Sequence, residues 1–203
     1  MAQDVGSCAV IGGKMELSPD RTTQEQHRLA DRERFRSVMG HFASGVTIIT
    51  TRHEGIDYGL TASAVSSLSL DPPMLLICVN RTSNTQKAIA QSQVFAVNIL
   101  REHQSEVARH FASSRPQKFG GMSVSYGALG VPLLADTLAT IECRVTAEVT
   151  GGTHSVFLAE VETAQAAEGM PLTYFRGRMG RFAFMSVDAG ASLWRDMQWE
   201  DAA

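Results

Sequence analysis

The feature that most restricts the fold of this chain is a two-residue alternation that continues through a glycine pair near its C-terminal end. In residues 142–149, apolar or small side chains alternate with charged or hydroxyl side chains, as in a strand with one apolar face. Gly151 and Gly152 then permit a tight turn, and residues 154–164 continue as a second strand. The apolar face of the first strand is expected to carry Cys143, Val145, Ala147 and Val149. This long hairpin predicts an antiparallel sheet.

Other short segments with strand character precede the hairpin. They are residues 46–53, a partner that starts at Tyr58, and residues 74–80 and 95–100, with helical patterns at 84–91 and 102–113. Residues 74–80 are continuously apolar, so burial on both faces is expected. Strands joined mainly by turns must close or stack to hide their edges. The predicted fold class is therefore mainly β with peripheral helices, a small closed or split β-barrel, and the absence of GxGxxG disfavours a Rossmann fold.

Composition narrows the class of protein further. The chain has 203 residues, 18 Lys and Arg against 21 Asp and Glu, and a net charge of -3, which argues against a nucleic-acid-binding role. It lacks an apolar run long enough to predict a membrane span. The three cysteines show neither CxxC nor Cys/His metal spacing, and their odd number argues against a disulfide framework. We expect a cytoplasmic protein without a metal site.

The chain is expected to contain one folded domain. Residues 1–30 are polar and largely aperiodic, and they predict a disordered N-terminal tail. The domain is expected over 31–185, and 186–203 form a C-terminal extension. It begins with a helix from Asp31, whose apolar face carries Phe35, Val38, Met39 and Phe42.

Two hydroxyl-rich segments flank the apolar strand 74–80. The first, residues 59–73, carries Thr61 and four serines among small residues, and the second, residues 80–86, reads NRTSNTQ. Ser83 or Asn84 is expected to cap a helix whose free N–H groups, with Arg81, suit an anion. The alternative for both segments is local: hydroxyls that satisfy nearby backbone groups, which composition alone favours for the first. Their positions on either side of one strand favour a shared phosphate site.

At this point the order of several motifs resembles a known family, the short-chain flavin reductases, which are the reductase components of two-component flavin-dependent monooxygenases. The motifs are FRSVMGHFASGVTIITT, GLTASAVSSLSLDPPMLLICVN, KFGG, LATIECRV, GGTHSVFLAEV and PLTYFRGRMGRF, and the resemblance covers about residues 34–182. It implies a homodimer of split barrels of the FMN-binding type, with FMN or FAD near the dimer interface. NADH or NADPH then passes hydride to flavin N5, and the diffusible reduced flavin reaches a partner oxygenase through a transient encounter.

The resemblance also assigns residues. The isoalloxazine edge is expected to contact Val46, Thr47, Thr61, Ala62, Ser63 and Ala64. The ribityl chain and phosphate are expected to contact Ser67, Ser69, Asn80, Arg81, Ser83 and Thr85, with Phe111 and Lys118 at the rim. His154 matches the histidine of the family's Gly-Asp-His turn, which serves the nicotinamide and is the expected catalytic residue.

Two departures from the family pattern fall on the pyridine-nucleotide side. Thr153 stands where the family has Asp, so the hydrogen bond that orients the histidine ring is either lost or supplied elsewhere. Arg178 and Met179 follow the Arg-Gly pair where the family commonly has an aromatic residue. This substitution leaves the nicotinamide's stacking partner undefined and offers Arg178 to the dinucleotide phosphates.

Three alternatives to a flavin reductase stay open at the level of sequence. The same barrel supports a flavin-dependent oxidase of a small substrate and a reductase of a corrin. A different class is a non-catalytic flavin or haem carrier or sensor, which would keep the hydroxyl-rich segments while the nicotinamide side changes.

Overall fold

The structure is a computed structural model that describes residues 31–115 and 117–185. The predicted N-terminal tail and C-terminal extension lie outside these residues. The chain divides into two compact units, with the boundary between Met39 and Gly40. The described part of the first unit is a helix over residues 31–39, as the spacing of its apolar residues predicts.

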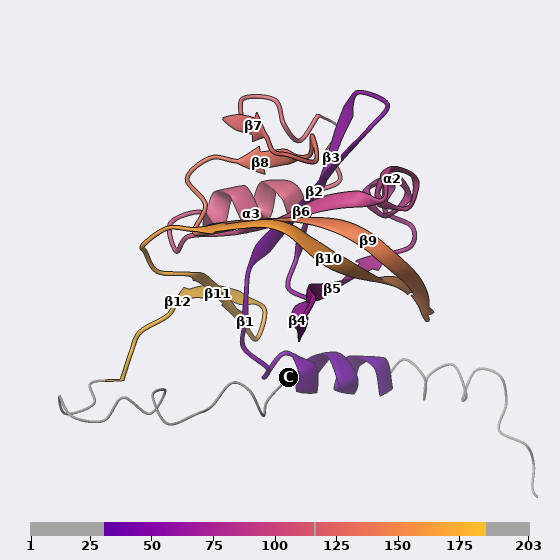
Figure 1. Ribbon diagram of the computed structural model, residues 1–203. Coiled ribbons are helices and arrows are strands. Elements are labelled where there is room, and N and C mark those ends of the chain that lie inside the picture. The colour runs from indigo at the N-terminus through magenta and orange to yellow at the C-terminus, as the bar shows by residue number, and fades with distance from the viewer. Residues whose placement is uncertain (1–30, 116, 186–203) are drawn as a thin grey trace, which may run out of the picture. The chain divides into compact units, whose positions relative to one another are not determined.

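The second unit is built on a seven-stranded antiparallel sheet (Figure 1). Its strands are β2 (Thr47–His53), β3 (Ile56–Ala62), β4 (Val65–Leu70), β5 (Pro73–Asn80), β6 (Val94–Ile99), β9 (Ala139–Gly151) and β10 (His154–Ala166). Their order across the sheet is β3-β2-β6-β9-β10-β5-β4. The long strands β9 and β10 form the predicted hairpin, in which His154 pairs with Gly151 across a two-residue turn.

The order of the strands shows how the sheet closes. β3 and β4 are its opposite edges, yet only Ser63 and Ala64 separate them in the chain. The sheet must therefore curl until its edges meet, and the N–H group of Cys78 on β5 donates to the carbonyl of Ala64 (3.0 Å). Over the rest of its length β3 pairs only with β2. This gap between β3 and the end of β5 is called the seam below, and the predicted split β-barrel is confirmed.

Smaller elements surround the barrel. They are β1 (Ser44–Gly45), β11 (Leu172–Phe175) and β12 (Arg178–Arg181) in one sheet, β7 (Val124–Tyr126) and β8 (Pro132–Leu134) in another, and the helices α2 (Asn84–Ser92) and α3 (Ser105–Ala112). Both helices match the sequence prediction closely. The short strands β7, β8, β11 and β12 had not been predicted, because three or four residues are too few to show a period.

Aliphatic and aromatic side chains fill the barrel interior. Phe95, Phe157, Ile49, Ile77 and Cys143 are fully buried there. A second cluster, around Phe111, Leu100 and Leu172, joins α3, β8 and β11 to the outside of the barrel.

Two predicted burial patterns need correction. In β5, Leu75 and Val79 are buried but Leu76 and Cys78 are only half-buried, so the strand is not buried on both faces. In β9, Val149 is exposed, because the hairpin extends beyond the core at its turn.

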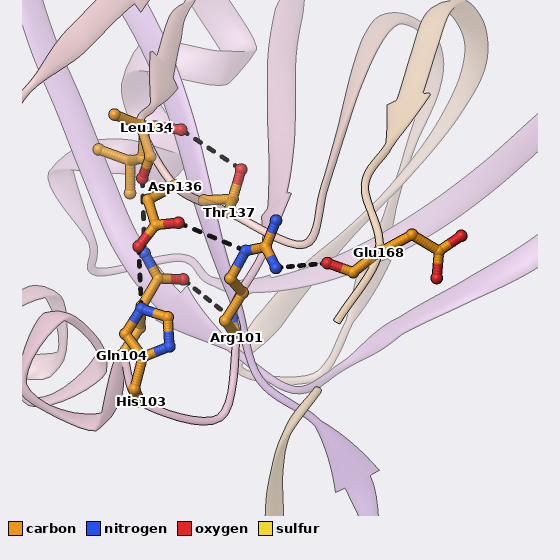
Figure 2. Close-up of polar contacts among 8 residues, drawn as sticks. Arg101, His103, Gln104, Leu134, Asp136, Thr137 and Glu168 are labelled. Carbon is orange, nitrogen blue, oxygen red and sulfur yellow. Dashed lines mark hydrogen bonds and ion pairs between the residues drawn. The ribbon is translucent and has the colours of Figure 1, made fainter. Parts of the chain in front are cut away.

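Arg101 connects two loops of the second unit, the one before β9 and the one before β11 (Figure 2). Its guanidinium donates to the carbonyl of Glu168, and its Nε lies 3.5 Å from the carboxylate of Asp136, which also contacts His103 Nε2 (2.9 Å). Gly169 has a φ of 150°, and a Cβ there would lie 2.4 Å from Arg101 Nη1, so this approach requires glycine. The side chain of Arg101 therefore joins the loop before β9 to the loop before β11. Across residues 31–115 and 117–185, no helix combines the length and apolar character that a membrane span requires.

Candidate functional site

A pocket of about 830 Å³ opens at the seam. Its walls come from β3, the Ser63–Ala64 link, the end of β5, the start of α2, residues 111–115 and 117–118, and His154. Its volume lies within the roughly 300–1,000 Å³ typical of small-molecule sites. The pocket exists here because the strand ladder is interrupted, so that backbone groups and short side chains line a gap that a further strand would otherwise fill.

The end of β3 and the link after it bring four residues predicted to contact the flavin ring to the pocket: Thr61, Ala62, Ser63 and Ala64. The Thr61 hydroxyl donates to the Ala108 carbonyl (2.6 Å), which ties the end of β3 to α3. Behind it, the Thr47 hydroxyl donates to the Ala62 carbonyl (2.8 Å). These hydroxyls hold the wall in place, while the small residues 62–64 leave open space in front of it.

The start of α2 supplies hydrogen-bond donors to the same pocket. Ser83 caps the helix as predicted, its hydroxyl oxygen accepting from the N–H group of Gln86 (3.1 Å), so the hydroxyl proton stays available. The backbone N–H groups of Asn84 and Thr85 have no acceptor within the part of the chain that the structure describes. Asn80 shapes the preceding turn, because its Oδ1 accepts from the N–H group (2.9 Å) and hydroxyl (2.8 Å) of Thr82. Several donors therefore converge at a helix N-terminus, as an anion requires.

His154 lies at the edge of the pocket, where it is the first residue of β10 and pairs with Asn80 of β5. Its Nδ1 is 3.0 Å from the hydroxyl of Thr153. The residue that departs from the family pattern thus still contacts the histidine ring. This contact orients the ring and leaves Nε2 for a ligand.

The two predicted rim residues brace the pocket wall. Lys118 Nζ donates to the carbonyls of Phe111 (2.8 Å) and Gly59 (3.1 Å), and burial lowers the pKa of this ammonium group. Phe111 is buried edge-to-face against Phe119, with the ring centroids 5.2 Å apart. A Cβ on Gly59 would lie 2.7 Å from the Phe111 ring, so this glycine allows α3 to approach β3.

Six residues predicted for the site do not line this pocket, and their predicted roles stay predictions. They are Val46, Thr47, Ser67, Ser69, Arg81 and Arg178. Val46 and Thr47 are buried at the start of β2. On β4, Ser69 accepts from the N–H group of Asp71 (3.2 Å), the local role that the alternative interpretation gave these serines. Arg178 lines a separate pocket on the β11–β12 hairpin, and Arg81 lines a recess beside the seam pocket.

Other pocket residues had no signal that we recognised in the sequence. They include Cys78, Ser113, Ser114, Arg115 and Gln117. Cys78 could have been found from its phase, since alternate residues of β5 point away from the core. Residues 113–115 and Gln117 reach the pocket because α3 packs beside β3, a contact that a sequence pattern does not show. In the described ranges, no cluster of His, Cys, Asp and Glu could hold a metal ion.

A split barrel with a hydroxyl-rich, anion-accepting pocket at its seam defines the class of protein: a barrel that binds a phosphorylated planar cofactor. The comparison with known families specifies the class. A model described as a flavin reductase like domain matches residues 39–183, and the chain belongs to this family.

Individual relatives agree with this assignment. The chain is 46% identical over 172 residues to the reductase component of a 4-nitrophenol 4-monooxygenase/4-nitrocatechol 2-monooxygenase from Rhodococcus opacus, covering 85% of this chain and 90% of the relative. It is 38% identical over 161 residues to an NADH-dependent FAD reductase from Streptomyces globisporus, covering 75% and 87%. Among solved structures, nitrilotriacetate monooxygenase component B from Mycobacterium thermoresistibile has a TM-score of 0.75 at 38% identity, covering 77% and 89%.

These matches confirm the predicted family, fold class and activity. The chain is a flavin reductase, and the relatives that it matches include an NADH-dependent FAD reductase and the reductase component of a monooxygenase. This assignment favours the flavin reductase over the oxidase, corrin reductase and carrier alternatives.

Proposed function

We propose that the seam pocket holds the flavin and that NADH docks over it beside His154. The observation that carries this placement is the convergence of three separate sequence segments on one pocket. The small residues at 61–64, the turn and helix start at 80–85, and His154 all line it. The residues present also fit a flavin, because they combine a flat wall of small side chains with a set of donors for a phosphate.

The flavin phosphate belongs at the start of α2. The Ser83 hydroxyl and the N–H groups of Asn84 and Thr85 are available to donate to it, and the N-terminal end of the helix favours negative charge. The ring then lies toward Ala62, Ser63 and Ala64, where short side chains allow close approach of the backbone.

The flavin and the nicotinamide supply the redox chemistry when bound, so the protein has to align them and exclude water. His154 is placed to do this for the nicotinamide, with its ring fixed by Thr153. Lys118 and Phe111 act through the wall: they keep the segment after α3 against β3 and so set the width of the pocket. All of these contacts are noncovalent, which suits an enzyme that releases its reduced flavin.

We further propose that the enzyme works as a cytoplasmic homodimer. Tyr174, Phe175, Phe182 and Phe184 are exposed on and beyond the β11–β12 hairpin, a concentration of aromatic surface that a second subunit would cover. Cys78 and Cys143 are free thiols, in keeping with a reducing compartment. Light scattering is expected to give twice the 22.0 kDa of one chain, and a monomer at micromolar concentration would contradict the dimer.

Two substitutions test the placement of the cofactors. Ser83→Ala removes a phosphate donor and is expected to weaken binding of both FMN and FAD by roughly tenfold, with Ser66→Ala on the exposed part of β4 as the matched control. His154→Ala is expected to raise the KM for NADH while flavin affinity is unchanged. Unaltered flavin binding in Ser83→Ala, or equal damage to flavin and NADH in His154→Ala, would contradict the placement.

A further inference from the structure

We propose that a second recess beside the seam pocket receives the adenylate half of FAD, so that FAD rather than FMN is the preferred flavin of this enzyme. This inference rests on the proposed placement of the flavin phosphate at the start of α2. The recess and the proposed phosphate position lie on opposite sides of the 80–82 turn.

The recess has a volume of about 620 Å³ and lies between the start of α2 and the end of the β9–β10 hairpin. It is lined by Asn80, Arg81, Thr82, Gln86, Lys87, Glu148, Thr150, Gly152 and Thr153. Apart from one glycine, every lining residue has a polar side chain. Such a surface suits a sugar and a phosphate and offers little to an apolar segment of a partner protein.

The charges of the recess favour an anion. The side chains of Arg81 and Lys87 are exposed, and neither forms an ion pair within residues 31–115 and 117–185. Glu148 is the only carboxylate of the lining, and it already accepts a hydrogen bond from Gln86 Nε2 (2.9 Å). The lining thus carries two cations and one carboxylate, and this net positive charge matches the chemistry of a nucleotide phosphate.

The recess adjoins the seam pocket. Asn80 and Thr82 line both, and Arg81 lies between them in the chain with its side chain on the recess side. A ligand whose first phosphate is held by Ser83 therefore has to pass only the 80–82 turn to enter the recess. FMN ends at that phosphate, whereas FAD continues with a second phosphate, a ribose and an adenine.

NADH offers the same adenylate chemistry from the other direction. Thr153 lines the recess and His154 lines the pocket, so a dinucleotide bound at the histidine could also extend toward Arg81. The path past the shared 80–82 turn favours FAD. The experiment measures flavin affinity and the KM for NADH separately, so that it distinguishes the two ligands.

Charge reversal at Lys87 tests the proposal in the full-length protein. Lys87 is exposed on α2, so Lys87→Glu leaves the packed face of the helix intact. The matched control is Arg144→Glu, which makes the same change of charge on the exposed side of β9, outside the recess. Titration of tryptophan or flavin fluorescence is expected to show FAD affinity falling roughly tenfold in Lys87→Glu, with FMN affinity within about twofold of the parent. Added salt should reduce the preference for FAD in the parent.

Three outcomes would overturn the proposal. Equal loss of FMN and FAD affinity would place Lys87 at the phosphate that both flavins share. Unchanged affinity for both would show that the recess holds no part of FAD, and a change confined to the KM for NADH would assign it to the pyridine nucleotide. The underlying proposal, that the flavin phosphate lies at the start of α2, is tested separately by Ser83→Ala. Unchanged FMN affinity in that variant would contradict it, whatever the result for Lys87→Glu.

Discussion

The barrel interior and the seam are built from the same strands, but they differ in what satisfies the backbone. In the interior, β6, β9 and β10 pair along their whole length and enclose Phe95, Phe157 and Ile77, all without solvent exposure. At the seam, β3 and the end of β5 do not pair, and hydroxyl and small side chains take the place of a partner strand. The unpaired donors that a folded core cannot tolerate are therefore concentrated where a ligand can use them.

This contrast implies a division of labour. Stability should depend on the interior and on buried groups away from the seam, whereas cofactor affinity should depend on seam residues with little effect on stability. The five predictions that follow test the division, from the largest expected effect to the smallest.

Truncation of the interior should produce the largest loss of stability. Phe157→Ala removes a fully buried ring and is expected to lower the free energy of unfolding by about 3–5 kcal/mol. Chemical denaturation followed by circular dichroism measures this loss. Below the unfolding transition, FMN affinity should stay within about twofold of the parent. A large loss of affinity at nearly unchanged stability would show that the interior and the seam are not separable.

The second prediction concerns a buried carboxylate in the closed part of the barrel. Glu142 accepts from the N–H groups of Ala128 (3.0 Å) and Leu129 (2.8 Å) and from the hydroxyl of Thr163 (2.9 Å). Glu142→Gln places an amide donor against these donors and is expected to cost about 2–3 kcal/mol of unfolding free energy. Thr163→Val, which removes a single donor, should cost about 1 kcal/mol. Equal costs would show that the two backbone contacts contribute nothing.

Glu142 also shows where sequence patterns stop being informative. The alternation in 142–149 correctly puts Glu142 on the face opposite Cys143, and on an isolated hairpin that face would be wet. The turn at 127–130 covers it, so the residue is buried. Local periodicity gives the face of a strand, but which distant segment covers that face depends on tertiary packing.

The same limit applies to the site. The hydroxyl-rich segments could be recognised because each is local, and the Ser83 cap follows from its position before a helix. The resemblance to flavin reductases then predicted that both segments contact the flavin. The position of Arg81 in the adjacent recess could not be predicted, because adjacent residues of one turn line different cavities. Residues 113–115 and Gln117 were missed because their place at the pocket comes from the packing of Phe111 against Gly59.

The reactivity of the two described cysteines allows a direct comparison of the two regions. Cys143 lies in the interior, whereas Cys78 lines the seam pocket. Burial raises the pKa of Cys143 to about 12. In a Cys8→Ser background, maleimide should label Cys78 first, saturating FMN should slow that reaction, and Cys143 should react only on unfolding. Labelling of Cys143 in the native state at the rate of Cys78 would contradict the closed interior.

The raised pKa of Cys143 also predicts a pH dependence of stability. The folded protein keeps this thiol protonated up to about pH 12, whereas the unfolded chain releases the proton near pH 9. The contribution of this group is therefore complete below pH 9 and is lost as the pH rises toward 12. At pH 10 the loss amounts to about 1.4 kcal/mol. Denaturation of the parent and of Cys143→Ala at pH 8 and pH 10 measures the contribution of this thiol to the free energy of unfolding. Equal pH dependence in the two proteins would contradict the prediction.

The smallest expected effect is at the seam, in the contact between Thr153 and His154. Thr153→Val keeps the shape of the side chain but removes the hydroxyl that lies 3.0 Å from His154 Nδ1. Loss of one exposed hydrogen bond is worth about 1 kcal/mol, so the KM for NADH, measured with FMN as the flavin, should rise roughly fivefold. Because the hydroxyl acts only through the ring, the double variant with His154→Ala should be no worse than His154→Ala alone. Additive losses would mean that Thr153 contacts the nucleotide itself, whereas a fall in unfolding free energy without any change in KM would place this turn with the interior rather than the seam.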